Sequence, residues 1–190
     1  MSRSNICLGR MYYPVKTLGP GNRVGIWTLG CERNCTGCIS PEFQVYDKSR
    51  EVSIEDVMRM VAQIRTEIDG FTISGGEPFY NPNALRLLVD ALCAVNEDIL
   101  IFTGYTLEEL KNQKNVDIDS VLDKCAALVD GAYIEKLNDG RGLRGSSNQK
   151  YHIFKLFEKY AGIDWTDRNI QTVVFDSKVL NIGIPRGEFE

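Results

Sequence analysis

Residues 71–78 read Phe-Thr-Ile-Ser-Gly-Gly-Glu-Pro, a short apolar run that ends in two glycines, an acid and a proline. A short apolar run bounded by turn residues predicts a strand that is covered on both faces. Glycines at the end of such a strand let the backbone come close to another group, because they carry no side chain. The stretch therefore predicts a buried strand that ends in a ligand-binding turn, with Glu77 as an acceptor for a ligand amine.

Apolar runs and helical patterns alternate along the chain on both sides of this stretch. Further strands are predicted at residues 23–29, 99–102, 127–129 and 170–175, and helices at 54–68, 83–95, 107–110, 118–125 and 151–160. Alternation of this kind is typical of β/α units around a mainly parallel sheet. Four or five units make an open or partial barrel, because a complete eight-fold barrel needs about 250 residues. We therefore expect an α/β fold, a partial β/α barrel, in a single domain over residues 1–190, with an extended tail or edge strand over 176–190.

The charge and hydropathy of the chain argue against several classes of protein. Its 190 residues are 43% hydrophobic, with a net charge of −4 and a pI of about 5.2. An acidic chain without a clustered basic face does not predict a nucleic-acid partner. No apolar run approaches the roughly 18 residues that span a bilayer, and the N-terminus does not resemble a secretory signal. We expect a cytoplasmic protein with no membrane partner, whose reduced thiols serve metal binding or catalysis.

Three of the six cysteines lie in one short segment, Cys31-Glu-Arg-Asn-Cys35-Thr-Gly-Cys38. Closely spaced thiolates on one loop are typical ligands of iron–sulfur clusters, and three of them leave one iron of a four-iron cube open to another ligand. A structural zinc site needs four protein ligands, and the only histidine, His152, is remote in sequence. A Cys₃His zinc site stays open as an alternative on spacing alone. The other cysteines are assigned no role, because a free cysteine commonly behaves as a small buried hydrophobe: Cys7, Cys93 and Cys125.

Two more glycine turns follow predicted strands. Thr103-Gly104 and Asp130-Gly131 each come directly after one. Parallel α/β folds bind ligands at the carboxyl ends of their strands. The cysteine loop, residues 31–38, also follows a strand, so we expect all of these turns to meet at one site. The glycine- and serine-rich loop 138–149 is long enough to be functional, and we expect it to dock a partner or to close this site.

These motifs resemble those of the radical S-adenosylmethionine superfamily. The spacing of Cys31, Cys35 and Cys38 matches its signature, and Gly75-Gly76-Glu77-Pro78 is similar to its methionine-binding turn. Within the superfamily the chain is most similar to the small glycyl-radical-enzyme activases. That likeness covers roughly residues 5–150. Its local matches are Gly19-Pro-Gly-Asn-Arg23, Cys35-Thr-Gly-Cys38, Thr103-Gly-Tyr-Thr-Leu-Glu-Glu-Leu110, and Val129-Asp-Gly131 followed by Arg144-Gly-Ser-Ser-Asn-Gln149. Residues 151–190 form a C-terminal extension beyond it.

The resemblance implies a 4Fe–4S cluster and S-adenosylmethionine as cofactors. It implies that Cys31, Cys35 and Cys38 bind the cluster and that S-adenosylmethionine is contacted by Gly37, Cys38, Ile39, Ser74, Gly75, Gly76, Glu77, Thr103, Asp130 and Gly131. The implied activity is reductive cleavage of S-adenosylmethionine to a 5′-deoxyadenosyl radical, which takes a hydrogen atom from a backbone glycine of a partner enzyme. A flavodoxin- or ferredoxin-type protein is the implied electron donor. Two alternatives stay open: a radical enzyme that acts on a small molecule or peptide, and a non-catalytic iron–sulfur or zinc protein.

Overall fold

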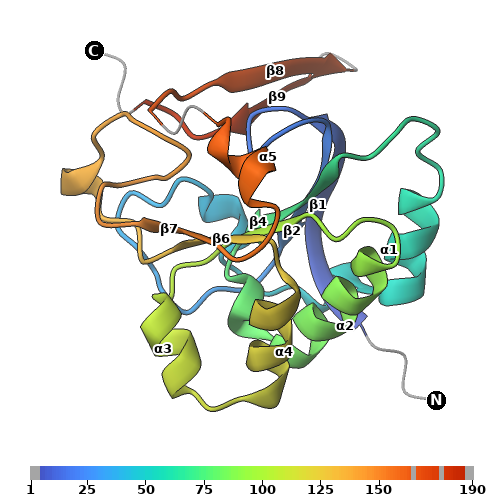
Figure 1. The fold of residues 1–190 in the computed structure, drawn as a ribbon. Helices are drawn as coiled ribbons and strands as arrows, with labels where there is room; N and C mark the ends of the chain where they lie inside the picture. Colours follow the sequence, from blue (N-terminus) through green and yellow to red (C-terminus); the bar gives the residue numbers. More distant parts are fainter. Residues whose placement is uncertain (1–4, 164–165, 176–177, 187–190) are drawn as a thin grey trace.

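The protein is described by a computed structural model over residues 5–163, 166–175 and 178–186. Its centre is a seven-stranded sheet with the strand order β3-β1-β2-β4-β5-β6-β7 (Figure 1). The strands are β1 (Asn5–Val15), β2 (Arg23–Thr28), β3 (Glu51–Ser53), β4 (Gly70–Gly75), β5 (Ile99–Phe102), β6 (Ala127–Asp130) and β7 (Lys150–Ile153).

The four strands β2, β4, β5 and β6 run parallel to one another. β1 and β7 flank them in the antiparallel direction, and β3 pairs antiparallel with β1. Most of the sheet therefore runs in one direction, which confirms the prediction of an α/β fold with mainly parallel strands. Because the carboxyl ends of the parallel strands meet at one edge, the segments that follow them come together there.

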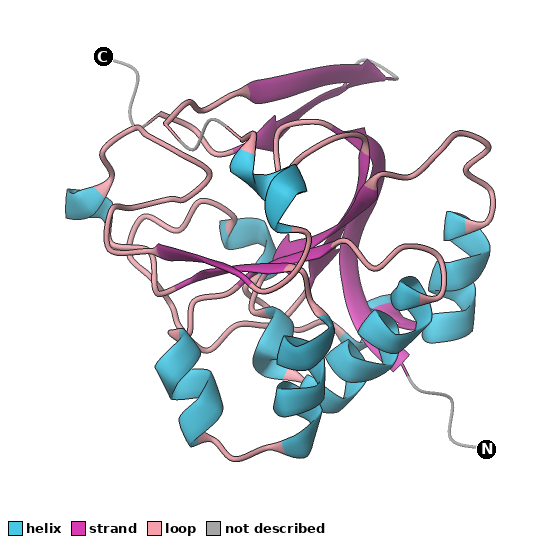
Figure 2. Ribbon diagram, in the orientation of Figure 1, coloured by secondary structure: helices cyan, strands magenta, loops and turns pink. Residues whose placement is uncertain are grey.

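Helices α1–α4 cover one face of the sheet (Figures 1 and 2). They are α1 (Ile54–Val61), α2 (Pro82–Cys93), α3 (Leu107–Asn112) and α4 (Val116–Lys124). Alternation along each strand decides which side chains face them. Ile99 and Ile101 of β5 pack in the helix-side core, whereas Leu100 between them joins the core on the other face. Within the described part of the chain, every helix is too short or too polar to span a bilayer.

The opposite face of the sheet carries the last helix, α5 (Phe157–Ala161), and a separate two-stranded sheet of β8 (Ile170–Phe175) and β9 (Lys178–Gly183) (Figure 1). A buried ionic network attaches α5 to the sheet. Arg23 Nη1 lies 3.0 Å from Asp98 Oδ2, and both residues are buried. The Tyr160 hydroxyl donates to Asp98 Oδ1 at 2.5 Å, and Lys159 Nζ lies 2.7 Å from Asp98 Oδ2. The C-terminal extension is therefore bonded to the body of the protein.

The prediction of a helix over residues 151–160 is wrong. Lys150–Ile153 instead form β7, which pairs with β6, and only the end of the predicted range is helical. The apolar residues of this segment suit either element, and pairing with the open edge of β6 favours a strand. Leu156, with a φ of 55°, then turns the chain before α5 starts.

The sequence prediction also misplaces the end of one helix and misses two strands. The first helix ends at Val61 instead of continuing to residue 68. β1 and β3 are additional strands, and glycine, arginine and proline within β1 obscure its pattern in the sequence. The edge strand expected within residues 176–190 is present as β9, which pairs with β8. Residues 176, 177 and 187–190 lie outside the described residues.

Candidate functional site

The cysteine loop, residues 31–38, starts just after β2 at the carboxyl edge of the sheet. Backbone hydrogen bonds fix its first residues to the segment that follows the loop. Gly30 N donates to Phe43 O at 3.0 Å, and Cys31 N donates to Gln44 O at 2.9 Å. The start of the loop is therefore held in place by the chain itself.

The remainder of the loop turns back toward the protein. Cys38 N donates to Cys35 O at 3.2 Å and closes a turn. Gly37 has a φ of 68°, and a side chain there would meet Glu135 Oε1 at 2.6 Å, so only glycine fits without displacing that carboxylate. The thiols of Cys31, Cys35 and Cys38 are free and partly exposed. Burial raises the pKa of Cys31 above its ordinary value, and hydrogen bonds from backbone amides offset part of that rise.

The glycine turn after β4 is bonded directly to the start of the cysteine loop. Gly76 N donates to Thr28 O at 2.9 Å, and Glu77 N donates to Gly30 O at 2.8 Å. Gly75 has a φ of 110°, a backbone conformation that favours glycine. A Cβ atom at Gly76 would lie 2.4 Å from Gly30 O. The two glycines thus allow the ends of β2 and β4 to touch, a role beyond the close approach to a ligand expected from sequence.

Glu77 joins the end of β4 to the end of β5. Its carboxylate accepts hydrogen bonds from Phe79 N at 3.0 Å, Thr103 Oγ1 at 2.8 Å and Gly104 N at 2.7 Å. Burial raises the pKa of this carboxyl group, and the three donors partly counteract that rise. A carboxylate has about four acceptor positions, so about one is left for a ligand amine. The side chain mainly fixes the relative position of two strand ends.

These strand ends surround one cavity of about 640 Å³. A volume in this range is typical of sites for cofactors and other small molecules. The predicted residues that line the cavity are Cys31, Cys35, Cys38, Ile39, Ser74, Gly75, Gly76, Glu77, Thr103 and Gly131. The structure therefore brings both motifs and the two later glycine turns together at one site.

Gly37 and Asp130, predicted for the same site, are not among the residues that line this cavity. The buried Asp130 carboxylate accepts from Leu107 N at 2.6 Å and from Lys150 N at 3.3 Å. His152 Nε2 lies 2.9 Å from its Oδ2 atom. The side chain of Asp130 thus fixes the start of α3 and the start of β7, and it shapes the turn that follows β6.

Sequence reasoning did not identify Arg33, whose side chain also lines the cavity. Its Nη1 atom lies 3.4 Å from Glu109 Oε1, and its guanidinium stacks over the ring of Tyr105 at 4.7 Å. These contacts link the cysteine loop to α3 and to the turn that precedes it. They also hold a positive charge at the cavity wall. The one sequence signal that could have identified Arg33 is its position between Cys31 and Cys35.

The hairpin of β8 and β9 supplies a further part of the wall. The lining residues from this region are Ile170, Thr172, Asn181, Ile182, Gly183, Ile184 and Pro185. They belong to the extension that matches no motif, so nothing in the sequence placed them near the cysteines.

The loop 138–149 also reaches the cavity, through Gly145 and Gln149. Gln149 Oε1 accepts from Gly145 N at 2.6 Å and from Ser146 N at 3.1 Å. Its Nε2 atom donates to Gly131 O at 2.6 Å. These bonds fasten the loop to the end of β6. Its expected part in docking a partner or closing the site stays a prediction.

The arrangement of the thiols fits an iron–sulfur cluster. In the described residues, no three Cys, His, Asp or Glu side chains gather at a point that suits a single metal ion. A four-iron cube does not need such a point, because each thiolate binds a different iron. His152 lies against Asp130 and not among the residues of the cavity wall. The donors present therefore fit a cluster with three thiolate ligands better than a Cys₃His zinc site.

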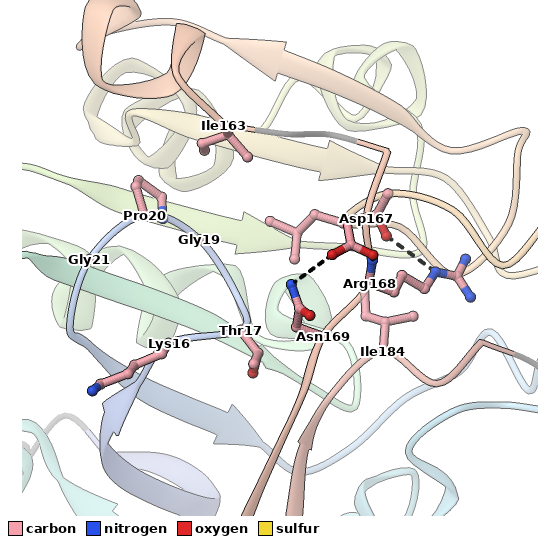
Figure 3. Close-up of a pocket in the computed structure, with 12 residues that line it drawn as sticks. Lys16, Thr17, Gly19, Pro20, Gly21, Ile163, Asp167, Arg168, Asn169 and Ile184 are labelled. Carbon is pink, nitrogen blue, oxygen red and sulfur yellow. Dashed lines mark hydrogen bonds between the residues drawn. The ribbon is translucent and has the colours of Figure 1, made fainter.

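A second cavity, of about 260 Å³, lies between the glycines of residues 19–21 and the segment around Asp167 (Figure 3). The Asp167 carboxylate accepts from Arg168 N at 2.9 Å and from Asn169 Nδ2 at 3.3 Å. None of the cysteines lines this cavity. The Asp167 carboxylate is already hydrogen-bonded, so we interpret this second cavity as a junction between the extension and the body of the protein.

Comparisons with known proteins agree with this geometry. Residues 17–152 match the family described as a 4Fe-4S single cluster domain. The chain is 32% identical over 155 residues to the anaerobic ribonucleoside-triphosphate reductase-activating protein of Vibrio cholerae, which covers 76% of this chain and 97% of the relative. It is 33% identical over 154 residues to the protein of that name from Escherichia coli K12, covering 74% and 95%. The Haemophilus influenzae protein of the same name is 33% identical over 157 residues, covering 76% and 97%.

A search of solved structures found the crystal structure of QueE from Escherichia coli. It superposes with a TM-score of 0.45 and 18% identity, over 54% of this chain and 53% of that one. A likeness at this level carries no conclusion about the present chain.

Proposed function

The chain belongs to the 4Fe-4S single cluster domain family and to the family of anaerobic ribonucleoside-triphosphate reductase-activating proteins, and we propose that it generates a glycyl radical on such a reductase. The reaction is reductive cleavage of S-adenosylmethionine, followed by transfer of a hydrogen atom from a backbone glycine of the reductase. One observation carries the proposal: three free thiols and the glycine turn after β4 line the same cavity of about 640 Å³.

Cys31, Cys35 and Cys38 hold the cluster as thiolates. Three thiolates leave one iron of a four-iron cube without a protein ligand, which provides a position for S-adenosylmethionine. When bound, the cluster supplies the electron that divides S-adenosylmethionine into methionine and a 5′-deoxyadenosyl radical. The protein's own task is to hold the two cofactors together within one cavity.

Two groups of residues bind S-adenosylmethionine in this proposal. Ser74, Gly75, Gly76 and Glu77 contact its methionine end. Gly37, Cys38, Ile39, Thr103, Asp130 and Gly131 lie along the nucleoside. Support for the second group comes from Ile39, Thr103 and Gly131, which line the cavity. Asp130 contributes indirectly, by fixing the turn that contains Gly131.

No side chain of the site has to act as a general acid or base. The Glu77 carboxylate already accepts three hydrogen bonds, and His152 is directed at Asp130. Hydrogen-atom transfer moves a proton and an electron together, so it needs no separate base. The residues around the cavity therefore act by positioning and by excluding water.

Several broader features belong to the same proposal. We take residues 1–190 as a single domain in which the four parallel strands form a partial β/α barrel of the radical S-adenosylmethionine type. The ligand cavity at the carboxyl ends of those strands supports this reading. We further propose a cytoplasmic protein with a flavodoxin- or ferredoxin-type electron donor and with neither nucleic acid nor a membrane as partner. The acidic composition, with a net charge of −4, supports the last point.

The direct test is anaerobic reconstitution with iron and sulfide. The reduced protein is expected to form 5′-deoxyadenosine from S-adenosylmethionine when dithionite supplies electrons. Incubation with the anaerobic ribonucleoside-triphosphate reductase of the same organism is expected to give an EPR doublet from a glycine radical on that reductase.

The outcomes separate the three candidate functions. Bound zinc without iron, and no cleavage of S-adenosylmethionine, would favour a non-catalytic metal protein and would overturn the proposal. Cleavage coupled to a small molecule or peptide, without a radical on the reductase, would favour the other type of radical enzyme. A reductase radical that requires both S-adenosylmethionine and reductant would support the activase.

A further inference from the structure

The hairpin of β8 and β9 pairs with no strand of the seven-stranded sheet in the described part of the chain. An isolated two-stranded hairpin is only marginally stable in water, so its attachment decides whether it keeps one position. Gln171 Oε1 accepts from Lys16 N at 3.0 Å, and Gln171 Nε2 donates to Pro14 O at 2.8 Å. Ile182 packs in the same hydrophobic cluster as Leu18. One face of the hairpin, its inner face, is therefore fixed to the body of the protein.

A buried arginine fixes the base of the hairpin to loop 138–149. Arg168 Nη1 donates to Pro185 O at 2.6 Å, and Arg168 Nη2 donates to Gly145 O at 3.1 Å. Its Nε atom donates to Gly142 O at 3.2 Å. Because Pro185 and Gly145 both line the cavity, the base of the hairpin and the loop form one continuous wall.

The other face of the hairpin, its outer face, consists of Ile170, Thr172, Val174, Val179 and Asn181. The register places Thr172 opposite Asn181 and Val174 opposite Val179, so these side chains stand on one side of the hairpin. Ile170 is 43% exposed, Val174 is 69% exposed and Val179 is 63% exposed. Apolar side chains grouped on one exposed face are characteristic of an interaction surface.

The outer face continues into the candidate site. Ile170, Thr172 and Asn181 line the same cavity as Cys35 and Cys38. The pair of Val174 and Val179 is the next pair on this face, two cross-strand pairs beyond Thr172 and Asn181, and it lies outside the cavity lining. A path of side chains therefore leads from the exposed end of the hairpin to the cysteine loop.

We propose that the outer face of the hairpin docks the glycine-bearing segment of the reductase as an apolar stretch of chain that enters the cavity. This inference rests on the proposed function, in which a backbone glycine of a partner protein has to reach the cavity. A segment that enters beside the hairpin has to pass along its outer face, because the base of the hairpin is part of the cavity wall. Covering the exposed isoleucine and valines removes apolar surface from water, which favours binding. The unpaired edges of β8 and β9 offer backbone donors and acceptors to an extended segment.

The test replaces the valine pair without disturbing the hairpin. The double variant Val174→Lys/Val179→Glu places opposite charges across the two strands, which supports their pairing while it removes the apolar surface. The matched control is Val95→Lys/Val116→Glu, at two exposed valines near α2 and α4. Both variants are reconstituted with the cluster. Their Kd for the reductase is measured anaerobically by surface plasmon resonance, and uncoupled formation of 5′-deoxyadenosine is measured with dithionite alone.

We expect the hairpin variant to raise the Kd for the reductase about tenfold or more, because the contact loses two apolar side chains that it would cover. Uncoupled cleavage of S-adenosylmethionine should stay within about twofold of the unmodified protein in both variants, since neither valine of the hairpin lines the cavity. The control should bind the reductase normally. An unchanged Kd in the hairpin variant, or an equal rise in the control, overturns the docking surface.

Two other outcomes are distinguishable from these. A hairpin variant that binds the reductase normally, but no longer forms a dimer seen for the unmodified protein in sedimentation, would assign the outer face to self-association and overturn the inference. Failure of the unmodified protein to cleave S-adenosylmethionine with dithionite would overturn the proposed function itself. The inference would lose its basis with it, whatever the binding data.

Discussion

The Thr103 hydroxyl donates to Glu77 Oε1 at 2.8 Å, and this bond connects the end of β5 with the end of β4 inside the candidate site. Both residues are buried, so water does not readily replace either partner. We expect Thr103→Val to lower the free energy of unfolding by about 1–3 kcal/mol, because the carboxylate loses one of its three donors. Urea denaturation of the cluster-free protein measures the change.

A double-mutant cycle isolates this bond. Glu77→Met and Thr103→Val should be non-additive by more than about 0.5 kcal/mol, because each substitution removes one partner of the same hydrogen bond. Thr66→Val is the matched control, since the Thr66 hydroxyl bonds to Tyr13 at an exposed position. It should change stability by less than about 0.5 kcal/mol. Additive effects at Glu77 and Thr103 would show that the bond does not couple the two strands.

The cysteine loop predicts a distinct spectroscopic result. Cys35→Ser should abolish the visible absorbance of a reconstituted cluster and reduce bound iron well below the roughly four atoms per chain expected for a complete cube. Cys93→Ser is the control, because Cys93 lies on α2 and outside the cavity lining. Full iron content in the Cys35 variant would exclude that thiol as a ligand. Loss of iron in the Cys93 variant would implicate a ligand set other than the predicted one.

Arg33 is expected to tune the electron transfer that starts the reaction. Its guanidinium lines the cavity between the cysteine loop and Tyr105, and reduction adds one negative charge to a bound cluster. Arg33→Gln should therefore lower the midpoint potential of the cluster by an amount on the order of tens of millivolts, because a partly exposed charge is partly screened. An EPR-monitored redox titration measures the potential. Arg59→Gln on α1 should leave it unchanged, and an equal shift in both variants would contradict a local effect of Arg33.

A site residue can be predicted from the sequence when it belongs to a motif of residues adjacent in the chain. It cannot be predicted when only residues distant in the chain define its surroundings. Cys31, Cys38 and Gly76 belong to compact motifs at strand ends, and the parallel order of the strands brings those ends together. Arg168 has no such local signature, because its hydrogen-bond partners are distant in the sequence. They are the carbonyl groups of Gly142 and Gly145, more than 20 residues earlier, and of Pro185, 17 residues later.

The same distinction explains the errors at the level of secondary structure. The apolar residues of 150–160 suit a helix or a strand, and the free edge of β6 decides for a strand at Lys150–Ile153. The hairpin of β8 and β9 is predicted as extended chain, but its place beside the cavity depends on contacts such as Gln171 with Lys16. The local sequence pattern predicts whether a segment forms a helix or a strand. The position of that segment in the fold depends on tertiary contacts, which the local pattern does not reveal.

The buried pair of Arg23 and Asp98 is expected to make the stability of the protein depend on pH in the acid range. Burial alone would raise the pKa of Asp98, but the Arg23 guanidinium, together with Lys159 and Tyr160, outweighs burial and holds that pKa below its ordinary value. Asp98→Asn leaves the buried guanidinium without its counter-charge, so we expect a loss of about 3–5 kcal/mol in the free energy of unfolding at pH 7. Asp123→Asn, at an exposed position on α4, should cost less than about 0.5 kcal/mol.

The pH dependence of this loss has a definite sign. A carboxyl group whose pKa is lower in the folded state binds its proton less readily there than in the unfolded chain, so it contributes stability above the unfolded pKa of about 3.9. That contribution disappears as the pH falls through the lowered folded-state pKa of Asp98. The difference in unfolding free energy between the unmodified protein and Asp98→Asn should therefore be constant near neutral pH and shrink progressively below about pH 4. A difference that persists unchanged in urea titrations at about pH 3 would show that the charge of Asp98 does not stabilise the junction between α5 and the sheet.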